Sequence, residues 1–119
     1  MANESTRALQ QLSDVFKALG HPTRLWIVRK LEQGECCVQD LVTGTDEEFS
    51  TISQHLNVLK HSGVVECERR GKQIFYRLHY PCLPWLIHCM EARNACTTLN
   101  SEEIRTTLRT QLEHLLRSI

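Results

Sequence analysis

The spacing of apolar residues changes from a helical to an alternating one at Gly63, and this change constrains the fold more than any other feature. Before Gly63, apolar residues recur every three or four positions, as on one face of an amphipathic helix. After Gly63 they alternate over 64–68 and 73–78, and Arg70-Gly71-Lys72 separates the two runs. Alternation on both sides of a short turn predicts a β-hairpin with a basic tip. We therefore expect a mainly α-helical fold with one β-hairpin.

The helical stretches are bounded by residues that start and stop helices. Gly20 and Gly34 each follow an apolar stripe, and Pro22 suits the first position of a helix. Helices are expected over 5–19, from Pro22 until Gly34, over 38–42, from Phe49 to Ser62, over 83–96 and over 101–119. The 119 residues contain no internal repeat or linker, which fits a single domain over 1–119.

The order of these elements is that of a winged helix-turn-helix, with the helix-turn-helix over 38–62 and the wing over 64–79. In that fold the second helix enters the major groove and the hairpin follows the DNA backbone. Small polar side chains suit base edges and phosphates, and arginine and lysine suit phosphates. The predicted DNA-binding residues are Ser50, Thr51, Ser53, Gln54 and His55 on the helix and Arg69, Arg70 and Lys72 on the wing.

Charge is neutral overall but unevenly distributed. The chain has 14 Lys and Arg against 14 Asp and Glu, so bulk charge does not indicate nucleic-acid binding. Between Ser50 and His79, five basic residues stand against two acidic ones, a local charge of +3 that suits phosphate contacts. The competing interpretations are an ordinary solvated helix and turn, or a winged-helix module that binds a protein partner.

Several stretches of the chain resemble the ArsR/SmtB repressors. They are 16–25, which contains Leu19-Gly20-His21-Pro22-Thr23-Arg24, then 50–60, 63–65 and 70–78. The resemblance covers roughly residues 9–90 and implies a homodimeric winged-helix repressor whose partner is double-stranded operator DNA. It implies that 5–19 and 101–119 form the dimer interface. It also implies that an inducer, commonly a metal or metalloid, releases the DNA, whereas DNA binding itself needs no cofactor.

The six cysteines are too few for a disulfide scaffold, so we expect mostly reduced thiols. In the arsenic-responsive branch that the chain resembles, the third helix carries Cys-Val-Cys-Asp-Leu. This chain has Cys36-Cys37-Val38-Gln39-Asp40-Leu41, so Cys37 matches the first thiol and Gln39 replaces the second. Cys36 offers a neighbouring thiol instead.

The predicted inducer-binding residues are Cys36, Cys37, Cys82 and Cys89. Vicinal thiols can chelate a trivalent arsenical or close into a strained disulfide. The expected inducer is therefore arsenite, antimonite or another thiophilic ion, and the alternative is a repressor switched by thiol oxidation. Cys82 and Cys89 stand seven positions apart, about 10.5 Å of helical rise, so tertiary packing must bring either one to the vicinal pair. Cys67 and Cys96 are expected to be small apolar core residues.

Catalysis and membrane insertion find no support in the sequence. It lacks a Gly-rich phosphate loop, a Gly-x-Ser-x-Gly elbow and a His-Glu-x-x-His motif, so we do not expect an enzyme. It also lacks an apolar run of about 18 residues and the pattern of a secretion signal, and we expect a cytoplasmic protein without a membrane partner. A zinc site on the last helix is not expected, because Arg117 stands where the zinc branch of the family has a ligand.

Overall fold

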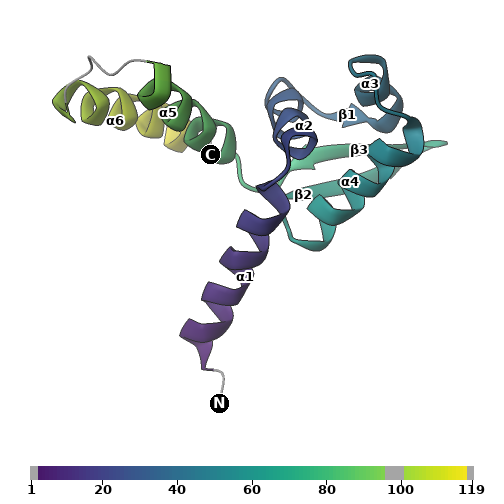
Figure 1. Ribbon diagram of the computed structural model, residues 1–119, viewed down its shortest axis with the longest axis horizontal. Helices are drawn as coiled ribbons and strands as arrows, with labels where there is room; N and C mark the ends of the chain where they lie inside the picture. Colours follow the sequence, from purple (N-terminus) through teal and green to yellow (C-terminus); the bar gives the residue numbers. More distant parts are fainter. Residues whose placement is uncertain (1–2, 96–100, 118–119) are drawn as a thin grey trace. The chain divides into compact units, whose positions relative to one another are not determined.

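The structure is a computed structural model that describes residues 3–95 and 101–117. It divides into two compact units, residues 1–80 and 81–119. The helices and strands of the first unit are α1 (Glu4–Leu19), α2 (Pro22–Glu32), β1 (Cys36–Cys37), α3 (Val38–Thr43), α4 (Phe49–His61), β2 (Val65–Arg70) and β3 (Gln73–Leu78). The second unit contains α5 (Leu83–Ala95) and α6 (Ser101–Arg117). The predicted combination of helices with a hairpin is confirmed (Figure 1).

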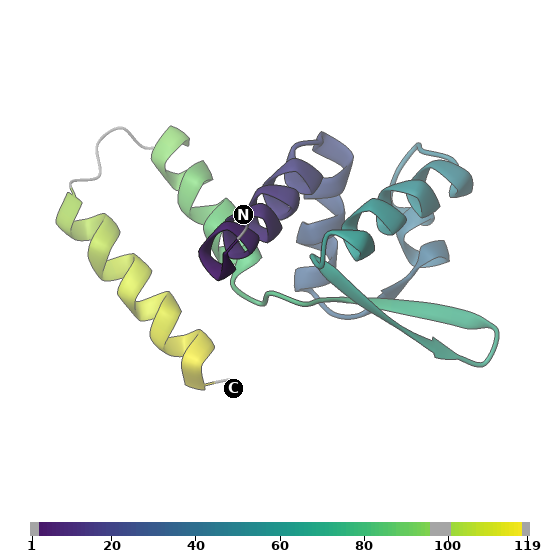
Figure 2. The same ribbon diagram turned by 90° about the horizontal axis from the view of Figure 1, so that it is seen from below.

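The chain passes from α3 through α4 into the hairpin, as expected for a winged helix-turn-helix. Gly63 follows the end of α4 with a φ of +83°, a left-handed conformation that glycine adopts without strain. Gly71, with a φ of +65°, forms the turn at the hairpin tip. The hairpin of β2 and β3 extends beyond the helices of the first unit as a wing (Figures 1 and 2).

The sheet has a third strand that the sequence pattern did not predict. β1 pairs antiparallel with β3, with Cys36 opposite Tyr76 and Cys37 opposite Phe75, which gives the strand order β1-β3-β2. A strand of two residues is too short to produce an alternating pattern, so only the long-range pairing identifies it. The pairing fixes the cysteine segment to the middle of β3.

The core of the first unit lies between α2, α3, α4 and the sheet. Its fully buried side chains are Ile27, Val28, Leu41, Ile52, Leu56, Leu59 and Val64. Three of them, Ile52, Leu56 and Leu59, come from one stripe of α4. Packing of this stripe determines which side of α4 is left to contact a partner.

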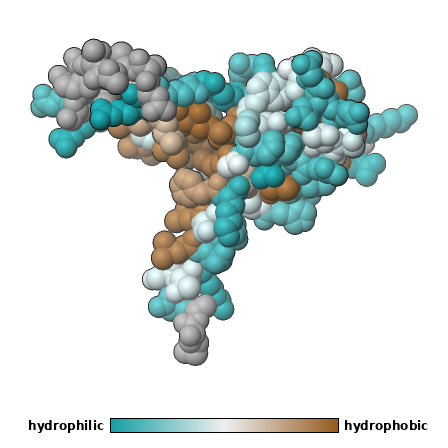
Figure 3. Space-filling view, viewed as in Figure 1, coloured by the Kyte–Doolittle hydropathy of each residue, from teal (hydrophilic) through white to brown (hydrophobic). Residues whose placement is uncertain are grey.

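α1 is packed only at its C-terminal end. Val15, Ala18 and Leu19 are buried there, whereas Leu9, Leu12 and Phe16 are each more than half exposed. Figure 3 shows apolar residues along one side of this helix. The helix predicted for dimerisation therefore presents an apolar stripe that the rest of the first unit leaves uncovered.

The second unit consists of two helices whose bounds match the prediction closely. Met90 on α5 and Leu112 and Leu116 on α6 are exposed apolar residues. Cys96, which the prediction assigned to a core, lies outside the described residues. Within 3–95 and 101–117, no helix has the length and apolar character that a bilayer crossing needs.

Arg24 of α2 joins three helices of the first unit. Its Nη1 donates to the main-chain oxygen of Ala18 in α1, and its Nε donates to Nδ1 of His55 in α4, both at 3.2 Å. The ring of His21 lies 4.5 Å from that of His55, centroid to centroid, and Nδ1 of His21 accepts from the main-chain N–H of Thr23 at the start of α2. These contacts fix α4 against the end of α1 and the beginning of α2.

His55 should make stability depend on pH. Burial, and then the neighbouring His21 and Arg24, lower the pKa of His55 below its ordinary value of 6.5. The unfolded chain binds the proton more readily, so the free energy of unfolding falls as the pH drops below about 6.5. His55→Gln keeps an acceptor for Arg24 without titrating. In urea unfolding, we expect this variant to lose less stability than wild type between about pH 7.5 and 5.5; equal losses would contradict the role given to His55.

Candidate nucleic-acid interface

α4 presents polar residues on the face opposite its buried stripe. Ser50 and Gln54 are exposed, and Thr51 and Ser53 are half-buried. These positions lie near the N-terminal end of the helix, which is the end that reaches base edges in helix-turn-helix proteins. Four of the five α4 residues predicted to bind DNA thus have accessible surface on one side of the helix.

His55 has a different environment from the other four. It is half-buried, accepts the hydrogen bond from Arg24 and packs on His21. Because its Nδ1 accepts from a guanidinium, the neutral ring carries its proton on Nε2. His55 thus holds α4 in place through Nδ1, and the contact of this residue with DNA stays a prediction.

Two exposed residues of α4 were missed by the sequence analysis. Phe49, the first residue of the helix, is 54% exposed, and Asn57 is exposed near its C-terminal end. Asn57 comes three residues after Gln54 and four after Ser53, so helical spacing alone places it on the same face. The accessible face of α4 is therefore longer than predicted.

All three predicted wing cations are exposed near the tip, and two of them, Arg69 and Lys72, have no carboxylate partner within the part of the chain that the structure describes. Arg69 is the last but one residue of β2 and Lys72 lies within the turn. The Nε of Arg69 lies 3.4 Å from the main-chain oxygen of Gly71. This arrangement suits the expected contact with a DNA backbone.

Arg70 is engaged within the chain instead. Its Nη2 lies 2.8 Å from a carboxylate oxygen of Glu68 and 2.8 Å from one of Glu35, and its guanidinium lies 5.0 Å from the ring centroid of Phe75. The hydrogen bonds with Glu68 and then with Glu35 raise the pKa of Arg70. The sequence count of basic residues did not reveal that this cation is already paired.

Arg77 extends these pairs into a network along the outer face of the sheet. Its Nε is 3.1 Å from Glu66, and its Nη1 is 3.5 Å from Glu68 and 3.6 Å from Glu35. Nδ1 of His79 lies 2.6 Å from Glu66, and this hydrogen bond is the main reason why the pKa of Glu66 is lowered. We call Glu35, Glu66, Glu68, Arg70 and Arg77 the wing charge network. It holds three carboxylates against two guanidinium groups.

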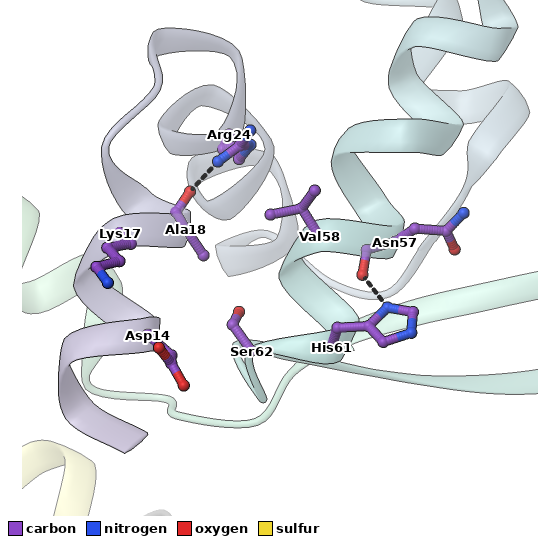
Figure 4. A pocket seen from close by; sticks show the side chains of 8 residues that line it. All are labelled: Asp14, Lys17, Ala18, Arg24, Asn57, Val58, His61 and Ser62. Carbon is purple, nitrogen blue, oxygen red and sulfur yellow. Dashed lines mark hydrogen bonds between the residues drawn. The ribbon is translucent and has the colours of Figure 1, made fainter. Parts of the chain in front are cut away.

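A hollow of about 480 Å³ lies between α1, α2 and the C-terminal part of α4. Its lining residues are Asp14, Lys17, Ala18, Arg24, Asn57, Val58, His61 and Ser62 (Figure 4). Three of its polar side chains are hydrogen-bonded to main-chain oxygens: Arg24 to that of Ala18, His61 to that of Asn57 and Ser62 to that of Leu59. The lining contains no cysteine, so this hollow does not provide a site for a thiophilic ion.

The vicinal cysteines occupy β1, where neighbouring side chains point to opposite faces of the sheet. Cys37 is buried and immediately precedes α3, and its main-chain N–H donates to the carboxylate of Asp40 at 3.2 Å. Cys36 is half-buried, with its Sγ 3.5 Å from the main-chain oxygen of Gly34. Burial, and then the nearby Asp40, raise the pKa of Cys36. The two thiols are adjacent in sequence, and the alternation of a regular strand would direct them to opposite faces.

The other candidate thiols are spread over both units. Cys67 is half-buried in β2, Cys82 is exposed just before α5, and Cys89 is half-buried within α5. Among the residues that the structure describes, no three histidine, cysteine, aspartate or glutamate side chains gather in a way that could hold a metal ion. The four-cysteine set of Cys36, Cys37, Cys82 and Cys89 therefore remains a prediction.

Comparison with known proteins agrees with this geometry. Residues 21–66, from α2 into β2, match the family described as bacterial regulatory protein, arsR family. The chain is 43% identical over 68 residues to the biofilm growth-associated repressor of Agrobacterium fabrum. The aligned stretch covers 57% of this chain and 58% of that protein. It is also 46% identical over 70 residues to the arsenical resistance operon repressor of Escherichia coli K12. That alignment covers 56% of this chain and 60% of the relative. The chain therefore spans less than two thirds of either relative.

A solved structure gives broader coverage. The homodimeric winged helix-turn-helix DNA-binding domain Mb0332 from Mycobacterium bovis, described as a possible ArsR-family transcriptional regulator, is 30% identical with a TM-score of 0.69. The match covers 80% of this chain and 88% of that one. This chain therefore belongs to the ArsR family of bacterial regulatory proteins.

Proposed function

We propose that this chain is a homodimeric transcriptional repressor that binds double-stranded operator DNA and releases it when a thiophilic inducer binds Cys36 and Cys37. The observation that carries DNA binding is the polar face of α4, which stands opposite a fully buried stripe of the same helix. A major groove admits one α-helix, and a glutamine such as Gln54 can bind adenine through two hydrogen bonds. Arg69 and Lys72 at the wing tip would hold the adjacent backbone.

The dimer is supported by the apolar stripe of α1. Leu9, Leu12 and Phe16 are 67%, 51% and 61% exposed, which is costly for a helix that stays in water. A second copy would cover this stripe, and the related domain from Mycobacterium bovis is described as homodimeric. A two-fold dimer presents two copies of α4 to two half-sites.

Gln54→Ala tests the assignment of the α4 face. We expect the variant to bind a duplex from upstream of the chain's own gene about 5- to 100-fold more weakly, because one bidentate base contact contributes about 1–3 kcal/mol. Its affinity for an unrelated duplex should remain unchanged, since Gln54 carries no charge. Fluorescence-anisotropy titration of both duplexes measures the two affinities.

Gln33→Ala is the matched control, because Gln33 is exposed beyond the end of α2 and outside the helix-turn-helix. It should bind both duplexes like wild type. Equal loss on both duplexes by Gln54→Ala would contradict a role in base recognition. Failure of the wild-type protein to prefer its own upstream duplex would instead favour a winged-helix module that binds a protein.

Arsenite suits the cysteine segment chemically. Arsenous acid condenses with two neutral thiols: two As–S bonds form, two As–O bonds break, and each thiol proton leaves with a hydroxide as water. The reaction needs no net loss of a proton, so the raised pKa of Cys36 does not oppose it. Antimonite would react in the same way.

Binding to both sulfurs would disturb the helix-turn-helix. Because adjacent strand residues point to opposite faces, Cys36 and Cys37 can meet one ion only if β1 gives up its regular pairing with β3. Cys37 directly precedes α3, and its N–H is bonded to Asp40 in the first turn of that helix. An ion on Cys37 would therefore displace the start of α3, the first helix of the helix-turn-helix.

Thiol oxidation is the second candidate for the switch, with less support. Peroxide attack requires a thiolate, and the pKa of Cys36 is raised while Cys37 is buried. A disulfide between the vicinal residues would also need side chains that face each other, whereas strand geometry directs them apart.

Cys37→Ser tests the inducer site. Serine is a good residue before a helix, so the variant should keep its affinity for the duplex, whereas release by stoichiometric arsenite should be lost. Cys67→Ser is the control and should still release DNA with arsenite. Release that persists in Cys37→Ser would move the sensing thiol to Cys82, Cys89 or Cys96. Wild-type release by peroxide, reversed by a dithiol and absent with arsenite, would support the oxidative switch.

A further inference from the structure

Glu35 connects the cysteine segment to the wing. It directly precedes β1, yet its carboxylate lies 2.8 Å from Nη2 of Arg70 and 3.6 Å from Nη1 of Arg77. The other two carboxylates of the wing charge network, Glu66 and Glu68, belong to β2 itself. Glu35 therefore joins the network from outside the wing.

The position of Arg70 shows what this contact does to a cation that was expected to bind DNA. Arg70 is the last residue of β2, beside the turn at the tip. Its guanidinium nevertheless lies over Phe75, which stands opposite Glu68 in the strand register. The side chain thus runs back along the outer face of the sheet, and two carboxylates contact its Nη2.

A phosphate would compete with these carboxylates. A guanidinium binds carboxylate and phosphate oxygens through the same planar N–H groups, so a phosphate that takes two parallel hydrogen bonds through Nη2 must displace the carboxylates that contact it. The side chains of Arg70 and Glu35 are 47% and 34% exposed, so solvent screens their attraction. The competition therefore changes DNA affinity by a modest factor and does not abolish binding.

We propose that Glu35 is a positioning residue that holds Arg70 away from DNA and so limits how many wing cations reach phosphate. This inference rests on the proposed function as a DNA-binding protein, but not on any particular inducer. Arg69 and Lys72 are then the wing's main contacts to the DNA backbone. Arg70 stays paired with carboxylates of the protein instead of binding phosphate. Removing the charge of Glu35 leaves Arg70 held by Glu68 alone, so that a phosphate competes for it more easily.

Glu35→Gln tests the proposal, with Glu66→Gln as its matched control. Both substitutions remove one carboxylate from the same network, but Glu66 is paired with Arg77 and His79 rather than with Arg70. We expect Glu35→Gln to tighten binding to the upstream duplex about two- to fivefold beyond Glu66→Gln, the range of an exposed ion pair. The plot of log affinity against log salt should also steepen, by up to about 0.9 for one added phosphate contact.

An Arg70→Ala background separates this effect from general charge. There, Glu35→Gln should act no more strongly than Glu66→Gln, because the cation that it frees is gone. Equal effects of the two substitutions in the wild-type background, or a Glu35→Gln gain that survives in Arg70→Ala, would overturn the proposal alone. Absence of specific binding by the wild-type protein would overturn the proposed function as well.

Discussion

The rotation of α4 about its own axis is the constraint on which the proposed DNA-binding surface depends. A recognition helix can present a defined set of side chains only if its other face is fixed. Burial of Ile52, Leu56 and Leu59 sets the rotation approximately, because turning the helix would expose all three. The hydrogen bond from Arg24 to His55 then fixes the helix at one edge, and the bond from Arg24 to Ala18 carries that constraint to α1. The polar face of α4 is a consequence of these contacts.

Some cations of the wing are paired with nearby carboxylates, so they are not all available to bind phosphate. The formally neutral chain places basic residues along the predicted DNA face, but the wing charge network pairs two of them with three carboxylates. The residues from Ser50 to His79 carry a net charge of +3, and adding Glu35, which contacts the wing from outside this range, lowers the sum to +2. The backbone contact then depends on a few exposed cations at the tip, so small changes in the network can alter DNA affinity. Because β1 is paired with β3, the cysteine segment and the wing share one sheet.

The sequence predicted those parts of the fold that produce a local pattern. Helical spacing located α1, α2 and α4, and alternation located β2 and β3, because each element is long enough to repeat. It could not locate β1, since two residues have no period and their pairing with Tyr76 and Phe75 is long-range. It could not show that His55 accepts a hydrogen bond from Arg24, because helical spacing does not reveal which residues of other helices pack beside α4. The pairing of Arg70 with Glu35 joins residues far apart in sequence and follows only from the register of the folded sheet.

Hydroxyl-radical footprinting of the full chain on DNA from upstream of its own gene tests the central claim most directly. The account predicts two protected half-sites on one face of the duplex, with centres one helical turn of about 10–10.5 base pairs, or a multiple of it, apart. That spacing requires two copies of α4 held in fixed positions by a dimer. A single protected half-site would contradict the dimer, and uniform weak protection at every position would contradict recognition of sequence by the face of α4.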